Sequence, residues 1–299
     1  MSENPLAINS YNSNHLSYAE MRPSYEDPIV DALVRDLAIT PRSSVLELAA
    51  GTGKFTLKLI DRGFSKIVVV EPSKGMLESF THSFPNIEAH LGSSYDIPLP
   101  DDSVDSIVIA QAFHWFSDEK SLKEMRRVLK DDGKVGLIWN FDYSTEGQSV
   151  SHGVEVEYIG AEAGEGESPS DVTKRIFSQH PWNEKVSEYV CSFGKNVPLY
   201  RHGTWREILE DNEYFKPIKK EIFSFTKVYE RYDNVFKYWE THSFITDLPE
   251  NKRKEVQATV EQYLETTVRE SDKSSHDGKV YLERYRGSNA LVLEPKSFD

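Results

Sequence analysis

A glycine-rich stretch, LELAAGTGKFT at residues 46–56, is the part of the sequence best suited to chemistry. A hydrophobic run ends near Ala49, Gly51 and Gly53 follow at alternate positions, and a helix-like segment comes next. Glycines at such a bend let backbone amides approach a ligand closely, because they carry no Cβ atom. The stretch therefore predicts a ligand-binding loop between a strand and a helix.

Two nucleotide-binding loops share part of this pattern. A P-loop requires G-x-x-x-x-G-K-[ST]. Gly53 and Lys54 supply the GK pair, but leucine stands at position 48 and phenylalanine at position 55, which disfavours ATP. A dinucleotide loop requires G-x-G-x-x-G. Thr56 stands where its third glycine belongs, so a nicotinamide-dependent oxidoreductase is a weaker alternative that stays open.

An acidic residue at the end of the next apolar run favours a third ligand. Glu71 follows three valines and lies 18 residues beyond Gly53. A carboxylate there can accept hydrogen bonds from two ribose hydroxyls. Together with this acid, the series Glu47-x-Ala49-x-Gly51-x-Gly53 resembles motif I, E/D-x-G-x-G-x-G, of class I S-adenosylmethionine-dependent methyltransferases.

Four successive stretches are similar to consecutive motifs of that family: VLELAAGTGKFT, VVVEPSKGML, LGSSYDIPLPDDSVDSIVIAQAFHWF and RVLKDDGKVGLIWN. The resemblance covers about residues 11–142. It is closest to the small-molecule enzymes, methyltransferase type 11, that include ubiquinone/menaquinone and trans-aconitate methyltransferases. The AFHWF segment at 112–116 and the Y-x-x-x-R-P-x-Y series at 18–25 look most like the trans-aconitate branch.

The resemblance implies S-adenosylmethionine as the cofactor and assigns its site. Gly51 and Gly53 would line the methionine and ribose, Glu71 would hold the ribose hydroxyls, and Met76 would pack near the adenine. The full implied set is Tyr18, Arg22, Glu47, Ala49, Gly51, Thr52, Gly53, Glu71, Pro72, Met76, Ser93, Ser94, Tyr95, Gln111 and Ala112. Two positions depart from the family pattern. Ala49 replaces the first glycine of the motif, and Ser93 replaces the acid that usually follows the third strand. A non-catalytic methyltransferase-like module therefore stays open as an alternative.

The resemblance also implies where the methyl acceptor binds. His114 and Trp115 would border the acceptor pocket, and Tyr18 and Arg22 would lie on a segment that folds over it. The candidate catalytic residues are therefore His114, Trp115 and Arg22.

The chemistry required of these residues depends on the acceptor. A carboxylate needs no general base, because it is ionised at neutral pH. A phenol or a carbon acid needs one, and His114 is the candidate. We predict in-line methyl transfer to a small molecule, on a carboxylate oxygen as in trans-aconitate, with a quinol or phenol as the alternative. An anionic acceptor requires cations, for which Arg22 is the first candidate and Arg175 and Arg201 are alternatives.

Alternating helical and apolar segments must position these residues. Helices are expected at 27–38, 54–61, 74–83 and 118–130, and strands at 45–50, 66–72, 87–92, 103–110 and 134–140. Unbroken apolar strands that alternate with helices predict a parallel sheet covered on both faces. We therefore expect a Rossmann-like, doubly wound α/β fold with a mostly parallel seven-stranded sheet, an antiparallel terminal strand and a helical cap insertion.

The chain is expected to divide into four parts. These are an N-terminal arm or lid at 1–25, a cofactor-binding core at 26–142, a mobile linker and helical cap at 143–215, and C-terminal strands and helices at 216–299 that complete the sheet and the substrate pocket. The Gly, Ser and Glu content of residues 144–171 indicates the mobile connection. KVYLERYRG and NALVLEP predict a terminal hairpin that turns at Gly287 and Ser288.

Composition excludes several other classes of function. The 299 residues carry 35 Lys+Arg against 49 Asp+Glu, a net charge of -14, which disfavours binding to nucleic acid. A single cysteine, Cys191, excludes an internal disulfide and a Cys-clustered zinc site, and no metal is predicted. No apolar run approaches the ~20 residues that span a bilayer, and the first 15 residues lack the features of a secretory signal. A cytoplasmic enzyme with a small-molecule partner, and no nucleic-acid or membrane partner, is expected; the oligomeric state stays open.

Overall fold

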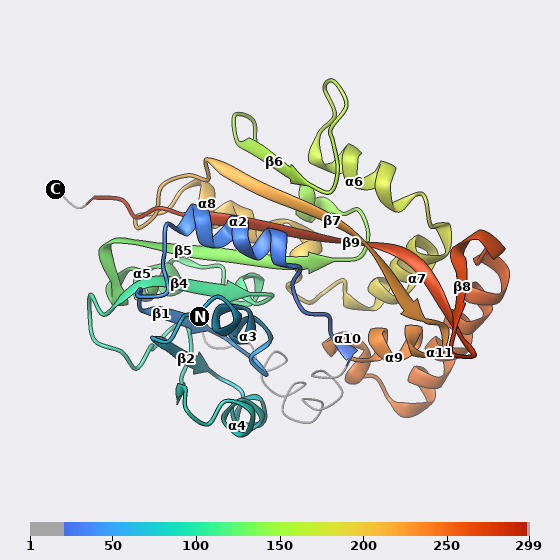
Figure 1. The fold of residues 1–299 in the computed structure, drawn as a ribbon, viewed down its shortest axis with the longest axis horizontal. Helices are drawn as coiled ribbons and strands as arrows, with labels where there is room; N and C mark the ends of the chain where they lie inside the picture. Colours follow the sequence, from blue (N-terminus) through green and yellow to red (C-terminus); the bar gives the residue numbers. More distant parts are fainter. Residues whose placement is uncertain (1–20, 298–299) are drawn as a thin grey trace.

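A mixed sheet runs through the centre of the computed structural model, which describes residues 21–297 and places nine strands in this sheet (Figure 1). The strand order is β3-β2-β1-β4-β5-β9-β7-β6, and β8 pairs with β9. The strands are β1 (Val45–Leu48), β2 (Ile67–Glu71), β3 (Glu88–Leu91), β4 (Val104–Ala110), β5 (Leu129–Phe141), β6 (Glu155–Ile159), β7 (Lys220–Arg231), β8 (Lys273–His276) and β9 (Lys279–Leu293). The neighbouring pairs β3–β2, β2–β1, β1–β4 and β4–β5 are parallel, as is the pair β6–β7. Strand β9 runs antiparallel to β5, β7 and β8. The predicted α/β class, with a mostly parallel sheet and an antiparallel terminal strand, is confirmed.

The predicted number of seven strands was too low. The stretch 144–171, expected to be a mobile connection, contains the edge strand β6, and a short β8 is added beside β9. Within β6, Glu157 forms ion pairs of 2.6 Å with both Arg35 and Lys220, which fasten this edge to its neighbours. The five-residue strand was missed because the Gly, Ser and Glu around it dominate the local composition.

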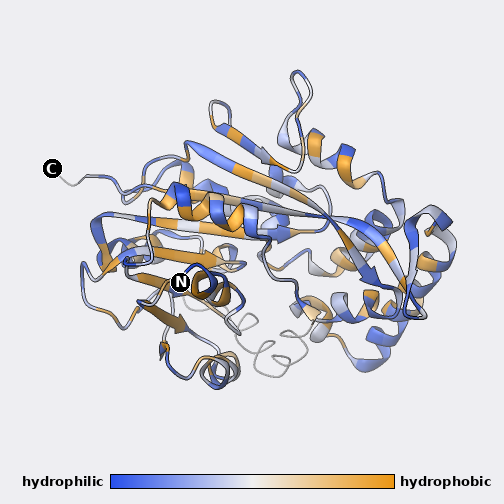
Figure 2. Cartoon of the chain, viewed as in Figure 1, coloured by the Kyte–Doolittle hydropathy of each residue, from blue (hydrophilic) through white to orange (hydrophobic). Residues whose placement is uncertain are grey.

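Helices cover both faces of the sheet. They are α2 (Asp27–Leu37), α3 (Lys54–Asp61), α4 (Lys74–Ser83), α5 (Glu119–Val128), α6 (Pro169–Phe177), α7 (Pro181–Cys191), α8 (Glu207–Glu210), α9 (Val235–Glu240), α10 (Ser243–Thr246) and α11 (Glu250–Thr267). One face buries Leu33 of α2 and Phe55 of α3, and the other buries Leu122 of α5 and Trp139 of β5. Figure 2 shows the central strands as hydrophobic, as expected for a parallel sheet covered on both sides. No helix within residues 21–297 is both long and apolar enough to cross a bilayer.

A helical cap stands at one end of the sheet. Helices α7, α9, α10 and α11 bury a third hydrophobic cluster that includes Trp182, Trp239 and Val260. Strands β7 and β9 extend from the sheet into this cap (Figure 1), and Leu282 of β9 belongs to its cluster. The cap therefore shares a strand with the central sheet.

The predicted hairpin at Gly287 and Ser288 is wrong, because residues 279–293 form one continuous strand. Gly287 pairs with Phe141 of β5, and a Cβ atom at position 287 would lie 2.1 Å from a carbon of the Phe141 ring. A glycine is therefore required at position 287 because an aromatic ring approaches the backbone closely, and not because the chain turns there. The turn falls ten residues earlier, at Asp277 and Gly278, which have φ angles of 49° and 69° and join β8 to β9.

Candidate active site

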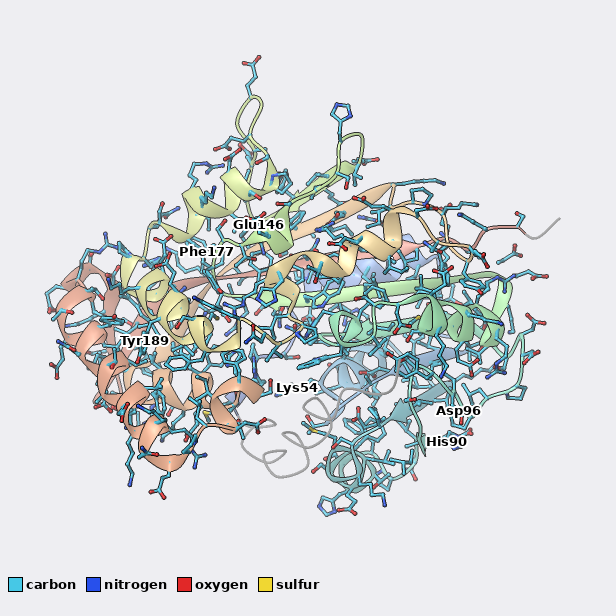
Figure 3. All side chains as sticks on the ribbon, turned by 180° about the vertical axis from the view of Figure 1, so that it is seen from behind. Lys54, His90, Asp96, Glu146, Phe177 and Tyr189 are labelled. Atoms are coloured by element: carbon cyan, nitrogen blue, oxygen red, sulfur yellow. The ribbon has the colours of Figure 1, made fainter. Side chains whose placement is uncertain are left out.

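A pocket opens at the carboxyl ends of β1, β4 and β5 and is closed on the other side by the cap. One half, which we call the cofactor half because the sequence predicts the cofactor there, is lined by Glu47, Ala49, Gly51, Thr52, Lys54 and Gln111. The other half, which we call the acceptor half because the methyl acceptor is expected there, is lined by His114, Trp115, Tyr143, Arg201, Tyr238 and His242. Lys54 lies between the sheet and the cap helices in Figure 3. The carboxyl edge of a doubly wound sheet is where ligands bind in such folds.

Two non-glycine residues on the pocket wall have left-handed backbone. Ala49 follows β1 with φ of 58°, and Gln111 follows β4 with φ of 61°. This conformation costs about 1 kcal/mol or more for residues other than glycine and persists where neighbouring structure enforces it. The amide of Ala49 donates to Val70 O at 2.7 Å, and that of Gln111 donates to Ile138 O at 2.8 Å. The sheet therefore fixes both turns at the mouth of the pocket.

The two motif glycines have different surroundings. A Cβ atom at Gly51, where φ is 59°, would meet nothing within 4 Å, so open space lies beside this residue. A Cβ atom at Gly53 would lie 2.4 Å from Phe84 and 2.9 Å from Phe80. Gly51 thus permits close approach of a ligand, whereas Gly53 permits close packing of the loop on α4.

Glu71 ends β2 beneath this loop and is 5% exposed. Its Oε2 accepts a hydrogen bond of 2.8 Å from the amide of Gly51, and its Oε1 accepts one of 2.8 Å from the amide of Ser73. Each carboxylate oxygen has a further lone pair, so two more donors can bind. Burial raises the pKa of Glu71 to about 7. Pro72 follows in the chain, and Met76, whose amide donates to Ser73 Oγ at 3.3 Å, is buried on α4.

Glu47 has one buried oxygen without a partner. Its Oε2 accepts the hydroxyl of Thr56, while Oε1 has no hydrogen bond. Burial raises the pKa of this carboxyl to about 8. An orphaned carboxyl oxygen on a pocket wall is suited to a ligand that brings a hydrogen-bond donor.

The predicted residues after β3 are not among those that line this pocket, and neither are Glu71 and Met76. Ser94 accepts a hydrogen bond of 2.9 Å from Ser121, and the Tyr95 hydroxyl donates to Asp118 at 2.9 Å. Ser93 is buried in the same turn. Figure 3 shows Asp96 at the far side of the core from the cap residue Tyr189. These side chains fasten the turn to the start of α5.

His114 is held in one tautomer. The indole N–H of Trp139 can only donate, and it donates to His114 Nδ1 at 3.2 Å. The proton of the neutral ring is therefore on Nε2. Burial lowers the pKa of His114 to about 3, so the ring stays neutral at physiological pH. His114 can donate a hydrogen bond to an acceptor molecule. It has no free lone pair with which to take a proton.

A second histidine connects the N-terminal segment to the cap. Arg22 Nη1 donates to Nε2 of His242 at 3.0 Å, and Nδ1 of His242 donates to Trp239 O at 3.0 Å. Burial lowers the pKa of His242 well below its usual value. The guanidinium of Arg22 lies 5.4 Å from the centre of the Tyr238 ring. The structure thus brings Arg22, predicted from the sequence, into the acceptor half.

Arg201 is the second arginine of the acceptor half. Its Nη1 donates to the Tyr143 hydroxyl at 3.0 Å, and its guanidinium carbon lies 6.0 Å from the centre of the Phe244 ring. It forms no ion pair with a carboxylate among residues 21–297. Arg175, the other alternative cation, lies on the surface and pairs with Glu167 at 2.8 Å.

The end of β5 contributes a buried ion pair to the same region. Asp142 binds Arg284 through Oδ1 and accepts the Tyr238 hydroxyl through Oδ2. Burial opposes ionisation of Asp142, but the positive charges of Arg284 and Arg286 outweigh it and hold the pKa of this carboxyl at about 2.

Sequence reasoning missed part of the acceptor half. Of its residues, Tyr143, Cys191, Tyr238 and His242 belong to no motif. Asp142 could have been found, since it directly follows a strand that ends at the same sheet edge as Gln111. Among the predicted residues, Ala112 and Trp115 follow β4 beside His114, with Trp115 on the pocket wall. Tyr18 lies outside the described residues. Within those residues, no three His, Cys, Asp or Glu side chains are placed to hold a metal ion.

Comparison with known proteins identifies the family. The family model of a methyltransferase domain matches residues 46–137. An uncharacterised methyltransferase-like protein of Schizosaccharomyces pombe is 30% identical over 264 residues, which cover 88% of this chain and 89% of the relative. This chain belongs to the class I S-adenosylmethionine-dependent methyltransferases. It is not a nicotinamide-dependent oxidoreductase.

Further relatives agree with this family. A second uncharacterised methyltransferase of S. pombe is 28% identical over 285 residues, covering 95% of this chain and 98% of its own length. An uncharacterised methyltransferase of Mycobacterium tuberculosis is 40% identical over 131 residues, covering 44% of this chain and 52% of its own. A solved candidate type II methyltransferase of Anaeromyxobacter dehalogenans shares the fold, with a TM-score of 0.61 at 14% identity over 91% of this chain and 97% of that one.

The residues of this methyltransferase fit its cofactor, S-adenosylmethionine. Open space beside Gly51 admits a ligand against the backbone, and Glu71 keeps lone pairs for two ribose hydroxyls. The orphaned Oε1 of Glu47 suits the ammonium group of the methionine part. We expect Gly51, Glu71 and Glu47 to hold the cofactor in this way.

Proposed function

We propose that this methyltransferase transfers the methyl group to a carboxylate oxygen of a small organic acid. The observation that carries the proposal is that the acceptor half, within the described residues, offers no side chain that can remove a proton at neutral pH. An acceptor that binds there must already have an available lone pair at the reacting atom, as an ionised carboxylate does.

The two histidines are excluded as bases by their hydrogen bonds. The free lone pair of each neutral ring is occupied, in His114 by the indole of Trp139 and in His242 by the guanidinium of Arg22. A general base must reach the proton that it abstracts with an available lone pair. Neither ring satisfies this requirement.

The other titratable groups of the acceptor half are also unsuited. Burial raises the pKa of the Tyr143 and Tyr238 hydroxyls, and raises the pKa of the Cys191 thiol to about 11. These groups stay protonated at neutral pH. Asp142, with a pKa of about 2 and both oxygens engaged, is too weak a base to deprotonate a phenol.

The charge of the pocket supports an anionic acceptor. The protein carries a net charge of -14, yet Arg22 and Arg201 both face the acceptor half. Arg201 has no carboxylate partner in the described part of the chain, and a guanidinium binds a carboxylate with two parallel hydrogen bonds. Arg201 is therefore our candidate for binding the acid.

The chain's own contribution is mainly geometric. When bound, S-adenosylmethionine supplies an electrophilic methyl group on a positively charged sulfur, and the acceptor oxygen displaces a neutral thioether. The loop at Gly51 and the carboxylate of Glu71 would fix one reactant, and Arg201 and the Nε2–H of His114 would orient the other. Holding reactants in an aligned arrangement can lower a barrier by about 7–11 kcal/mol in favourable cases.

A transfer assay tests the proposal. Purified protein would be given S-adenosylmethionine labelled in the methyl group, together with a panel of trans-aconitate, other polyacids and monocarboxylates, and a matched panel of hydroquinones and phenols. We expect label in methyl esters, which release methanol in mild alkali, whereas methyl ethers do not. Arg201→Met should raise KM for the acid about tenfold or more and leave the affinity for S-adenosylmethionine unchanged. Turnover of quinols or phenols, with none across the acids, would overturn the proposal.

A further inference from the structure

A chain of buried polar side chains lies behind the wall of the acceptor half. We call it the Tyr200 network; it consists of Gln148, Tyr200, Arg206, Glu221 and Asn289. These residues come from four separate segments of the sequence, and no motif marks them. Of the five, only Tyr200 lines the pocket.

The network begins at the hydroxyl of Tyr200. This hydroxyl donates to Asn289 Oδ1 at 3.2 Å and accepts from Gln148 Nε2 at 3.4 Å. Asn289 Nδ2 donates in turn to Glu221 Oε2 at 3.0 Å. Asn289 and Glu221 are completely buried.

The network ends in an ion pair. The guanidinium of Arg206 binds both oxygens of Glu221, donates to Gly147 O at 2.8 Å and lies 4.3 Å from the centre of the Trp205 ring. A buried pair of this kind contributes little to net stability, because removing both charges from water is costly. The ion pair is therefore better explained by the orientation that it gives to neighbouring polar groups than by a gain in stability.

Tyr200 is also held by its ring and its backbone. The ring stacks on Phe141 at 5.8 Å and 17°, and on Trp205 at 5.8 Å and 20°. The indole N–H of Trp205 donates to the Tyr200 carbonyl oxygen at 3.0 Å. The ring, the hydroxyl and the backbone carbonyl of Tyr200 are thus each held by a different set of contacts.

The next residue in the chain is Arg201, on the short 3-10 helix Tyr200–His202. Its guanidinium is held in the pocket by a hydrogen bond of 3.0 Å to the Tyr143 hydroxyl and by the face of the Phe244 ring. A long arginine side chain loses binding strength when its backbone can shift, because more conformations compete with the bound one. Fixing Tyr200 therefore limits where the Arg201 guanidinium can lie.

We propose that the Tyr200 network is a positioning device that holds Arg201 in the acceptor pocket and so sets selectivity for anionic acceptors. The selectivity part rests on the proposed function; the positioning part does not. Tyr200, Asn289, Glu221 and Arg206 act through Arg201 and do not touch the substrate themselves, apart from the ring of Tyr200 on the wall.

A crystal structure of Tyr200→Phe tests the positioning part directly. The variant keeps both ring contacts and removes only the hydroxyl. We expect the 3.0 Å contact between Arg201 Nη1 and the Tyr143 hydroxyl to be lost or divided between conformers. An Arg201 side chain that is unmoved in the variant would overturn the proposal, whatever the acceptor proves to be.

Kinetics on the preferred acid test the selectivity part. Tyr200→Phe should raise KM about tenfold with kcat changed less than twofold, and the same change made in an Arg201→Met background should have no further effect. Effects that multiply in the double variant would show that Tyr200 acts independently of Arg201 and would refute the proposal. Failure of the wild-type protein to methylate any acid would refute the proposed function and the selectivity part together, and would leave the crystallographic result to decide the positioning part.

Two further variants separate positioning from stability. Replacing the ion pair by Arg206→Met together with Glu221→Met keeps the interior filled, a change that buried pairs often tolerate. This double variant should also raise KM for the acid, although Glu221 and Arg206 do not line the pocket and are linked to the Tyr200 hydroxyl through Asn289. An unchanged KM in the folded variant would count against the proposal. Tyr229→Phe is the matched control, because this exposed side chain does not line the pocket and its hydroxyl donates to Glu283 at 3.1 Å. KM should not change in this variant.

Discussion

The carboxyl groups under the glycine loop lie in an environment that opposes their charge. Burial raises the pKa of Glu71 to about 7 and that of Glu47 to about 8. Hydroxyl and ammonium donors bind the ionised forms better than the protonated ones. Binding of S-adenosylmethionine should therefore require both groups to lose their protons.

This requirement predicts a pH dependence of cofactor affinity. As pH falls from 8 to 6, the Kd for S-adenosylmethionine should rise, by up to about tenfold per pH unit for each group that binds a proton in the free protein. Glu71→Gln should weaken binding and reduce the slope of log Kd against pH by about one below pH 7. Isothermal titration calorimetry measures both quantities. Equal slopes for the two proteins would show that Glu71 does not titrate in this range.

The titration of His114 should not make kcat depend on pH in the neutral range. Its pKa is held at about 3 by burial, and its Nδ1 lone pair is occupied by Trp139. With both substrates saturating and a carboxylate acceptor, we expect kcat to be constant between pH 6 and 8. His114→Asn should lower kcat without changing the shape of the profile. A limb near pH 6.5 that disappears in this variant would instead identify His114 as a general base.

At the scale of secondary structure, one glycine decides whether β9 can lie against β5. A Cβ atom at Gly287 would overlap the Phe141 ring at 2.1 Å, and Phe141 itself is packed among other rings. Gly287→Ala should therefore destabilise the protein by about 1–3 kcal/mol, measured by urea unfolding. Gly278→Asn is the control, because that turn residue is unobstructed and asparagine tolerates its φ of 69°. A loss below 0.5 kcal/mol at Gly287 would mean that the ring moves aside freely.

The cofactor half could be predicted because its determinants are local. The pattern from Glu47 to Gly53 begins in the last residues of β1, and Glu71 is the last residue of β2. The edge of the sheet brings these two strand ends together.

The acceptor half could be predicted only in part: His114, Trp115 and Arg22 followed from the resemblance, and Arg201 was named only as an alternative cation. Tyr238 and His242 were missed, because they come from cap segments whose packing no periodicity encodes. Gly287 was misread for a related reason: a glycine required by a distant ring looks the same in sequence as one required by a turn.

At the scale of the whole molecule, Asp142 joins three parts of the structure. It directly follows β5, pairs with Arg284 of β9 and accepts the hydroxyl of Tyr238 from the cap. Its carbonyl oxygen accepts a hydrogen bond of 2.7 Å from Asn183 of α7. Removing one member of a buried pair leaves the other charge without compensation.

Asp142→Asn should consequently lower the free energy of unfolding by about 3–5 kcal/mol. Glu255→Gln serves as the control, since it breaks an exposed pair of 2.7 Å with Lys252 on α11 and should change stability by less than about 1 kcal/mol. Thermal or urea denaturation compares the two variants. Similar losses in both would mean that the Asp142 pair is no more important than a surface contact.

The position of β9 also has a consequence for how the chain is made. Strands β5 and β7 are both paired to β9 and not to each other, so the sheet stays divided until residues 279–293 have left the ribosome. Until then β5 presents an apolar open edge, the kind of surface that pairs with other chains. Synthesis of this methyltransferase therefore includes an interval, ending when β9 becomes available for pairing, in which chaperone protection of that edge would limit aggregation.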